Sequence, residues 1–179
     1  MYIIAQIVGI IAVATFLISY QLKKRSHIIA VNATSSVLYV LQYILLGAFE
    51  GAAIDVLSTV ATVAAHRKHT KFISKYQTAI IIILNLAFVV AGLRLYKNVF
   101  SLFPIIGAML QTSAFWISNE TKIRCVSFLG APFWLVYNFV SQAYGATIGS
   151  ALSIVSIGLA IYRYDIYPKI KEKIEECKK

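Results

Sequence analysis

A single acidic side chain lies within the apolar runs of this sequence, and it is the first residue that suggests chemistry. Asp55 stands about one helical turn into the apolar stretch Ala52–Ala65. An ionised carboxylate in hydrocarbon costs roughly a few kcal/mol, so such a group is expected to face a cavity, a partner or an interface. Two interpretations stay open: Asp55 couples a proton or a substrate in a central pocket, or it reaches headgroup water and caps a helix.

A second group of residues combines two aromatic rings with an amide. Trp134 precedes Asn138 by one helical turn, and Tyr137 stands beside it. Sites for sugars, nucleosides and vitamins use this mixture, because rings stack on the solute while an amide fixes its hydroxyls or amides. We therefore predict that these three residues bind substrate. The alternative is an interfacial aromatic belt with an asparagine that links helices.

The layout of residues 134–149 is repeated in residues 39–54, about 95 positions earlier. In each stretch an aromatic helix end meets a turn, and a helix of small residues follows. Tyr39 and Gln42 take the places of the tryptophan and the first tyrosine, so we predict that they bind substrate too. Such a repeat predicts an internal duplication, which is a common plan among transporters.

The two copies differ around their turns. The alignment places one extra residue, Glu50, in the first copy, and Asp55 then faces Gly149. The predicted pocket is therefore lopsided, with the acid on one wall and the aromatic rings and amide on the other.

Other polar and small residues at membrane depth suit helix packing better than ligand binding. Lone amides at Asn32, Asn85 and Gln111 are typical of hydrogen bonds between helices. Gly145 and Gly149 place a small-residue face on one helix, a pattern that favours close packing.

The composition excludes a soluble domain. Hydrophobic residues make up 59% of the 179 residues, charged residues only 13%, and the mean hydropathy is +0.76. Average globular chains carry about twice this fraction of charged residues. A chain this apolar would therefore expose a large hydrophobic surface to water. The net charge of +10 does not indicate nucleic-acid binding, since the cations cluster in short segments between apolar runs.

The apolar runs predict seven transmembrane helices. From Cys125 to Tyr162 about 38 residues carry no charge, nearly twice the ~20 that cross a bilayer, so this run must fold back at residues 142–145. The other hairpin is expected to turn at residues 49–51. The predicted spans are Tyr2–Leu22, Ile28–Gly47, Ala52–Ala65, Tyr76–Leu93, Val99–Ser118, Cys125–Ser141 and Ala146–Tyr164.

The charges between these spans predict the orientation. Of the 17 Lys and Arg residues, all but Arg94 and Lys97 fall on one side. The positive-inside rule places that side in the cytoplasm, with the N-terminus outside and the C-terminus inside. Two parallel three-helix repeats (residues 1–75 and 98–167) are then joined by a linker helix (76–97), and a short cytoplasmic tail follows (168–179).

Several runs carry a family resemblance: Pro104-Ile105-Ile106-Gly107, Arg124-Cys125-Val126, Trp134-Leu135-Val136-Tyr137-Asn138-Phe139 and the turn Tyr144-Gly145. Over Leu102–Tyr164, and more weakly in the first half, the sequence resembles the bacterial YgjV-type inner-membrane proteins. That family looks like a member of the MtN3 or PQ-loop superfamily, which includes the SWEET sugar transporters. The resemblance implies the same 3+1+3 layout in the bacterial inner membrane. It implies no substrate, since Tyr20-Gln21 and Ile117-Ser118 replace the Pro-Gln pairs.

We expect a transporter of a small polar solute, such as a sugar, a vitamin or a nucleoside, working by alternating access of the two bundles. The alternative is a PQ-loop-type receptor or sorting protein without solute flux. We expect no enzyme activity, because the spans hold one carboxylate and no histidine. No metal, cofactor or nucleic acid is expected. The expected partners are the lipid bilayer and the solute, with proton coupling and homo-oligomers left open.

Overall fold

The computed structural model describes residues 1–19, 25–68, 70–117, 119–168 and 170, and its secondary structure over these residues is entirely helical. In lipid every backbone N–H and C=O must find a partner within the segment, which favours helices for a chain this apolar. The prediction of an all-α membrane protein is confirmed. The helices are α1 (Tyr2–Ser19), α2 (Arg25–Leu45), α3 (Phe49–His66), α4 (Lys71–Lys75), α5 (Gln77–Arg94), the 3₁₀ turn η1 (Val99–Ser101), α6 (Leu102–Ala114), α7 (Glu120–Val140), α8 (Tyr144–Ile161) and the π-helical extension η2 (Tyr162–Ile166).

Three of these segments are long and apolar enough to cross a membrane by length and composition: Gln77–Arg94, Thr121–Val140 and Tyr144–Ile166. Three shorter apolar helical segments cover Tyr2–Ile18, Thr34–Leu45 and Val99–Ala114. These counts refer to the described residues. The full set of seven spans therefore stays a prediction, and the C-terminal tail from residue 171 onwards lies outside the described part.

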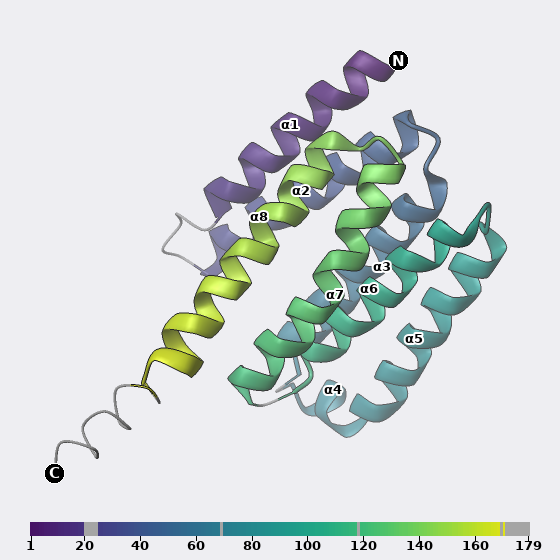
Figure 1. Cartoon of the computed structure of the whole chain (residues 1–179). Coiled ribbons are helices and arrows are strands. Elements are labelled where there is room, and N and C mark those ends of the chain that lie inside the picture. Colours follow the sequence, from purple (N-terminus) through teal and green to yellow (C-terminus); the bar gives the residue numbers. More distant parts are fainter. Residues whose placement is uncertain (20–24, 69, 118, 169, 171–179) are drawn as a thin grey trace, which may run out of the picture.

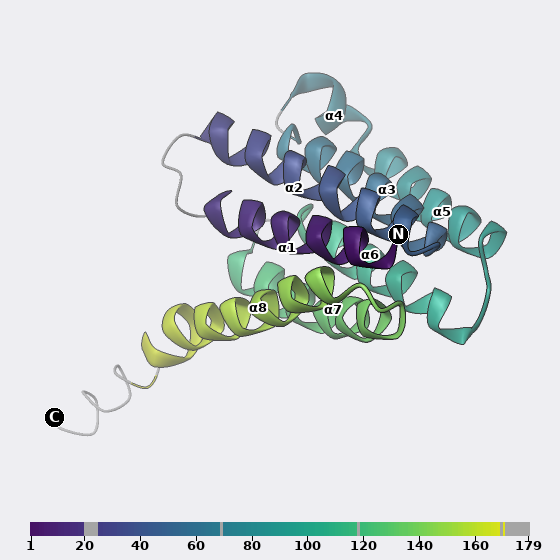
Figure 2. The same cartoon turned by 90° about the horizontal axis from the view of Figure 1, so that it is seen from above.

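Six helices form a closed ring. The order of neighbours is α1, α2, α3, α6, α7 and α8, and α8 packs back against α1. Seen from above, α1 to α3 form one layer and α6 to α8 the other, while α5 lies outside the ring against α3 and α6 (Figures 1 and 2). The third helix of each triplet thus meets the first helix of the other triplet.

A constant spacing relates the two triplets. Tyr43 and Asn138 are 95 residues apart, and the bounds of α2 and α7, and of α3 and α8, are offset by the same amount at both ends. The two hairpin turns share their geometry as well. The N–H groups of Ala48 and Ala143 bond the carbonyls of Tyr43 and Asn138, both at 2.9 Å.

This regularity corrects the predicted turns. The first turn lies at residues 46–48 instead of 49–51, and Gly47 adopts φ +72°, where glycine is favoured. The second turn lies at residues 141–143 instead of 142–145, and Gln142 takes the equivalent conformation with φ +56°. Because α3 and α8 begin at Phe49 and Tyr144, no extra residue interrupts the first copy, and Asp55 corresponds to Ser150 instead of Gly149.

Small residues bring the helix backbones close together. A Cβ on Gly107 would lie 3.1 Å from the Gly130 carbonyl oxygen, where α6 meets α7. At the equivalent place in the other triplet, the buried Ser35 hydroxyl donates to the Ala12 carbonyl at 2.8 Å. Between the triplets, a Cβ on Gly145 would lie 2.3–2.5 Å from backbone atoms of Gly9, so α1 and α8 are in direct backbone contact there.

The Gly9–Gly145 contact predicts a specific sensitivity to added volume. We expect Gly145→Ala to force α1 and α8 apart, and overpacking of this kind costs about 1–3 kcal/mol. The matched control is Gly158→Ala on the same helix, whose new Cβ would meet only a Phe128 ring atom at an ordinary 3.7 Å. Thermal unfolding in detergent measures both variants: a shift of several degrees is expected for Gly145→Ala alone. Equal melting temperatures for the two variants would contradict the proposed contact.

Candidate functional site

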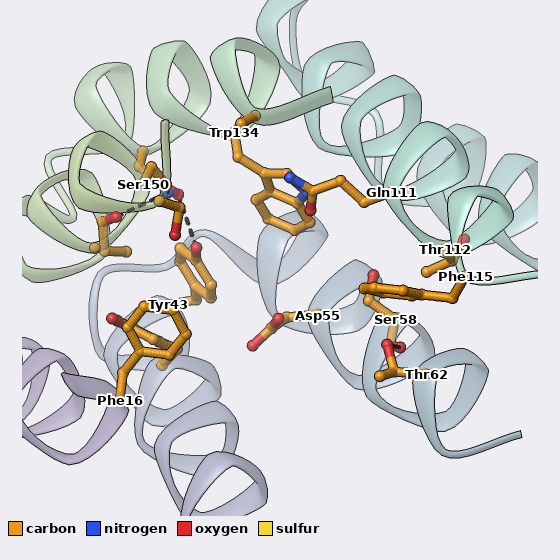
Figure 3. Close-up of a pocket in the computed structure, with 16 residues that line it drawn as sticks. Phe16, Tyr43, Asp55, Ser58, Thr62, Gln111, Thr112, Phe115, Trp134 and Ser150 are labelled. Atoms are coloured by element: carbon orange, nitrogen blue, oxygen red, sulfur yellow. Dashed lines mark hydrogen bonds between the residues drawn. The ribbon is translucent and has the colours of Figure 1, made fainter. Parts of the chain in front are cut away.

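A cavity of about 180 Å³ lies inside the ring, between the two triplets. Each of the six ring helices contributes to its lining, which Figure 3 shows from within. This space is several times larger than the space that one water needs, so it has the size of a small-molecule site. Many of the residues singled out in the sequence meet here, including Asp55, Trp134, Asn138 and Tyr39.

The floor of the cavity is a hydrogen bond between equivalent residues of the two triplets. The Tyr43 hydroxyl donates to Asn138 Oδ1 at 2.7 Å, and both residues are almost fully buried. Asn138 Nδ2 donates to the Ala146 carbonyl at 3.3 Å and to Ser150 Oγ at 2.9 Å. The amide hydrogens of Asn138 are therefore used within the protein, and this residue shapes the floor instead of offering a free donor.

Gln42 and Tyr137 lie behind this floor and outside the cavity lining. The Tyr137 hydroxyl accepts a hydrogen bond from the Gly51 N–H at 2.9 Å, which ties α7 to the start of α3. Gln42 Nε2 donates to Gln6 Oε1 at 3.4 Å and fills the space beside Gly9. Both side chains are buried, with at most 1% exposed. Neither residue lines the cavity in this conformation, because their side chains bridge helices at the end that holds the hairpin turns, and their binding of a solute stays a prediction.

Asp55 projects from α3 into the cavity, in the open space between Tyr43 and Trp134 (Figure 3). Its Oδ2 atom is buried and forms no hydrogen bond. Among the described residues, no lysine, arginine or histidine lines the cavity or forms an ion pair with this carboxyl group. Within the described part of the chain, Asp55 is thus an acid that lines the cavity without a counter-ion.

The wall beside Asp55 carries hydroxyls that are bonded to their own helices. Ser58 Oγ donates to the Ile54 carbonyl and Thr62 Oγ1 to the Ser58 carbonyl, both at 2.8 Å. Such back-bonding satisfies the hydroxyl proton and leaves the oxygen lone pairs facing the cavity. This wall therefore offers acceptors.

The opposite wall is aromatic. Trp134 lines the cavity beside Gln111 (Figure 3). Its ring packs closely against α6 because Gly107 has no Cβ to obstruct it. Phe16, Tyr39 and Phe115 extend the aromatic lining. Gln111, which the sequence suggested as a packing residue, lies at the cavity, while Asn85 on α5 bonds the Ile81 carbonyl at 2.8 Å. The side chain of Asn32 lies outside the described set.

Sequence reasoning did not select Tyr43 and Ser150, although both shape the floor. The signal for Tyr43 was present, since it aligns with Asn138 in the repeat. Ser150 is found only when the 95-residue spacing is carried through the turn without a gap, which makes it the counterpart of Asp55.

Several contacts link the helices at one end of the bundle. This hairpin end holds the turns at residues 46–48 and 141–143. Some of its contacts join the two triplets, and others join the α5–α6 connection to the first triplet. Gln6 Nε2 donates to the Gln142 carbonyl at 2.7 Å, and Lys97 Nζ lies 3.3 Å from Glu50 Oε2 and also bonds the Gly47 carbonyl.

Towards the other end the cavity continues to residues close to the helix C-termini, such as Phe16, Thr62 and Phe115. We call this the basic end, since Lys68 and α4 lie there. Lys68 Nζ contacts the carbonyls of Phe115 and Ile117 at 3.3 Å, which links α3 to the end of α6. The described contacts thus link the helices at the hairpin end, and the cavity lining extends from the Tyr43–Asn138 bond to residues near the basic end.

Comparison with known proteins gives the family. A family model described as a bacterial inner membrane protein, Imp-YgjV, matches residues 3–167. The chain belongs to the Imp-YgjV family. It is also similar to the inner membrane protein YgjV of Escherichia coli (strain K12), with 25% identity over 167 residues that cover 91% of this chain and 85% of that protein. No solved structure matches the chain. Together with the apolar helices, family membership places this protein in the bacterial inner membrane.

No group of three or more His, Cys, Asp or Glu residues with metal-binding geometry occurs in the described part of the chain. Cys125 is a free, exposed thiol on α7. The residues that meet at the cavity are one carboxylate, hydroxyls, two amides and aromatic rings.

The Tyr43–Asn138 bond predicts an energetic coupling between the triplets. Asn138→Ala leaves the buried Tyr43 hydroxyl without its acceptor, so we expect a loss of about 1–3 kcal/mol in unfolding free energy. Because Tyr43→Phe removes the other partner of the same bond, the double variant should lose less than the sum of the single losses, by about 0.5–3 kcal/mol. Unfolding of the detergent-purified chain measures all four members of the cycle.

The matched control for this cycle is Ser153→Ala, which lies at the same cavity and takes part in none of these bonds. It should be close to neutral and additive with Tyr43→Phe. Strict additivity of the Tyr43 and Asn138 variants would contradict the described floor.

Proposed function

We propose that this protein is a transporter that moves a small polar solute (sugar-, vitamin- or nucleoside-like) across the bacterial inner membrane by alternating access. The observation that carries the proposal is the cavity between two equivalent helix triplets, with links across the hairpin end and a lining that extends towards the basic end. When a solute site lies between two repeats, rocking of one repeat against the other changes the side of the membrane from which the site is accessible.

The proposed architecture has seven spans: the triplets α1–α3 and α6–α8, and α5 as the linker. Three features support it. The helix bounds repeat with one spacing, the contacts of α3 with α6 mirror those of α8 with α1, and α5 packs outside the ring. The resemblance to the MtN3 or PQ-loop superfamily supports the same layout.

In the proposed orientation the N-terminus and the hairpin end face outwards, and the basic end faces the cytoplasm, because the Lys and Arg residues concentrate there. The conformation described above is then the inward-facing state. To open outwards, the protein has to break the links at the hairpin end, among them Gln6–Gln142 and Lys97–Glu50. The C-terminal ends of α1 and α8 have to approach each other at the same time.

The direct test is flux. The full chain is purified, reconstituted in proteoliposomes and supplied with a panel of radiolabelled sugars, nucleosides, vitamins and amino acids. Saturable, protein-dependent accumulation of a panel member is the expected result. If the protein instead captures a partner stoichiometrically and moves none of the panel, the receptor or sorting function replaces the transporter.

A cross-link at the hairpin end is expected to stop transport. In a background with Cys125 and Cys177 replaced by serine, the pair Gln6→Cys and Gln142→Cys lies across the junction of the two triplets. A short, reducible thiol cross-linker should hold this end closed and lower flux at least tenfold, because the outward-facing state can no longer form. Reduction should restore flux.

The two single-cysteine variants, treated with the same reagent, are the controls and should transport normally. Undiminished flux through a quantitatively cross-linked double variant would refute the alternating opening of this end.

A further inference from the structure

We propose that the solute bound in this cavity is an organic cation, with an ammonium group that pairs with Asp55 and a body that lies against the aromatic walls. The inference rests on the proposed function, because it names the substrate class of the same cavity. Among the small polar solutes considered above, it separates cations from neutral molecules.

The first argument is the charge of the lining. Of the described residues that line the cavity, Asp55 is the one with a formal charge, and no cation balances it. Two cations at the ends of the bundle make contacts outside the cavity: Lys97 pairs with Glu50, and Lys68 bonds carbonyls at the end of α6. A buried carboxylate oxygen without a partner is costly at membrane depth, and a solute that supplies the missing positive charge removes that cost.

The second argument is the direction of the hydrogen bonds made by three hydroxyls of the lining. The hydroxyl protons of Ser58, Thr62 and Thr112 are donated to carbonyls of their own helices at 2.6–2.8 Å. Lone pairs of these oxygens therefore remain for the solute, and an ammonium group, which is donor-only, can donate to them.

The third argument is the aromatic lining. Phe16, Tyr39, Tyr43, Phe115 and Trp134 contribute rings to a cavity of about 180 Å³. The faces of such rings attract ammonium groups, and tryptophan does so most strongly. Figure 3 shows Asp55 within the ring of labelled aromatic residues, so one group can contact the carboxylate and the rings together.

The test compares solutes that differ in charge and hardly in shape. Choline is paired with neohexyl alcohol, in which carbon replaces the nitrogen, and phenethylammonium with phenethyl alcohol. Binding to the detergent-purified full chain is measured by isothermal titration calorimetry. We expect at least one of the two cations to bind at least tenfold more tightly than its neutral counterpart, the scale of one charge-assisted contact.

Variants locate the preference. Asp55→Asn keeps the shape of the side chain and should abolish the cation preference, while Asp55→Glu should retain it. Trp134→Leu should weaken cation binding more than Trp134→Phe. Asp165→Asn removes an acid outside the cavity, where it pairs with Arg124, and should leave the preference unchanged. The melting temperature of each variant shows that it is folded.

Equal binding of cations and neutral counterparts, binding of neither, or a preference that survives in Asp55→Asn would overturn the inference. Its failure is distinguishable from failure of the transport proposal. Saturable flux of a neutral solute that is insensitive to Asp55→Asn keeps the transporter and removes the cation. Asp55-dependent cation binding without flux in proteoliposomes keeps the cation and removes the transporter.

Discussion

The hydrogen bond between Tyr43 and Asn138 holds together the part of the molecule on which the cavity depends. It joins two residues that the 95-residue spacing makes equivalent, so it lies where the two triplets face each other symmetrically. The two residues differ, and their hydrogen-bonding groups complement each other. The Tyr43 hydroxyl donates, and Asn138 uses its carbonyl oxygen to accept and its amide hydrogens to donate to Ala146 and Ser150. Both groups are thus satisfied, which is required where water is excluded. The cavity lies on one side of this bond, towards the basic end, and the links at the hairpin end lie on the other side.

The two copies share a scaffold and differ in chemistry. The helix bounds, the hairpin turns and the close approaches of neighbouring helices recur in both triplets. The side chains at the centre do not: Asp55 corresponds to Ser150, and Gln42 corresponds to Tyr137. Ser150 already accepts a hydrogen bond from Asn138, whereas the Asp55 oxygen has no hydrogen-bond partner. One triplet therefore completes the floor, and the other presents the charged group to the cavity.

The sequence predicted the helices well, because long apolar runs bounded by charge leave little choice in a membrane. The turn positions were harder. The interpretation of Gly51 as a turn residue was wrong, since Gly51 lies inside α3 and is small because Tyr137 packs on it. The second turn uses Gln142 at φ +56°, and a glutamine gives no sign of that conformation. Glycine in this chain serves close packing more often than turning, since Gly47 alone of the nine glycines has a positive φ and seven others have no room for a Cβ. Spacing alone does not separate the two uses.

The same limit applies to the site. Trp134 and Asn138 are one turn apart, so they share a helix face, and both reach the cavity. Tyr137 lies on a different face of α7, and its position depends on which helix packs there. That neighbour is α3 of the other triplet, a long-range contact that periodicity does not encode. For Asp55 the sequence left two positions open, a cavity and the headgroup region, because either one spares the carboxylate the cost of contact with lipid. In the structure it lines the cavity. Sequence prediction in this fold therefore excludes the costly positions of a charged side chain, and the packing of the helices decides among the remaining ones.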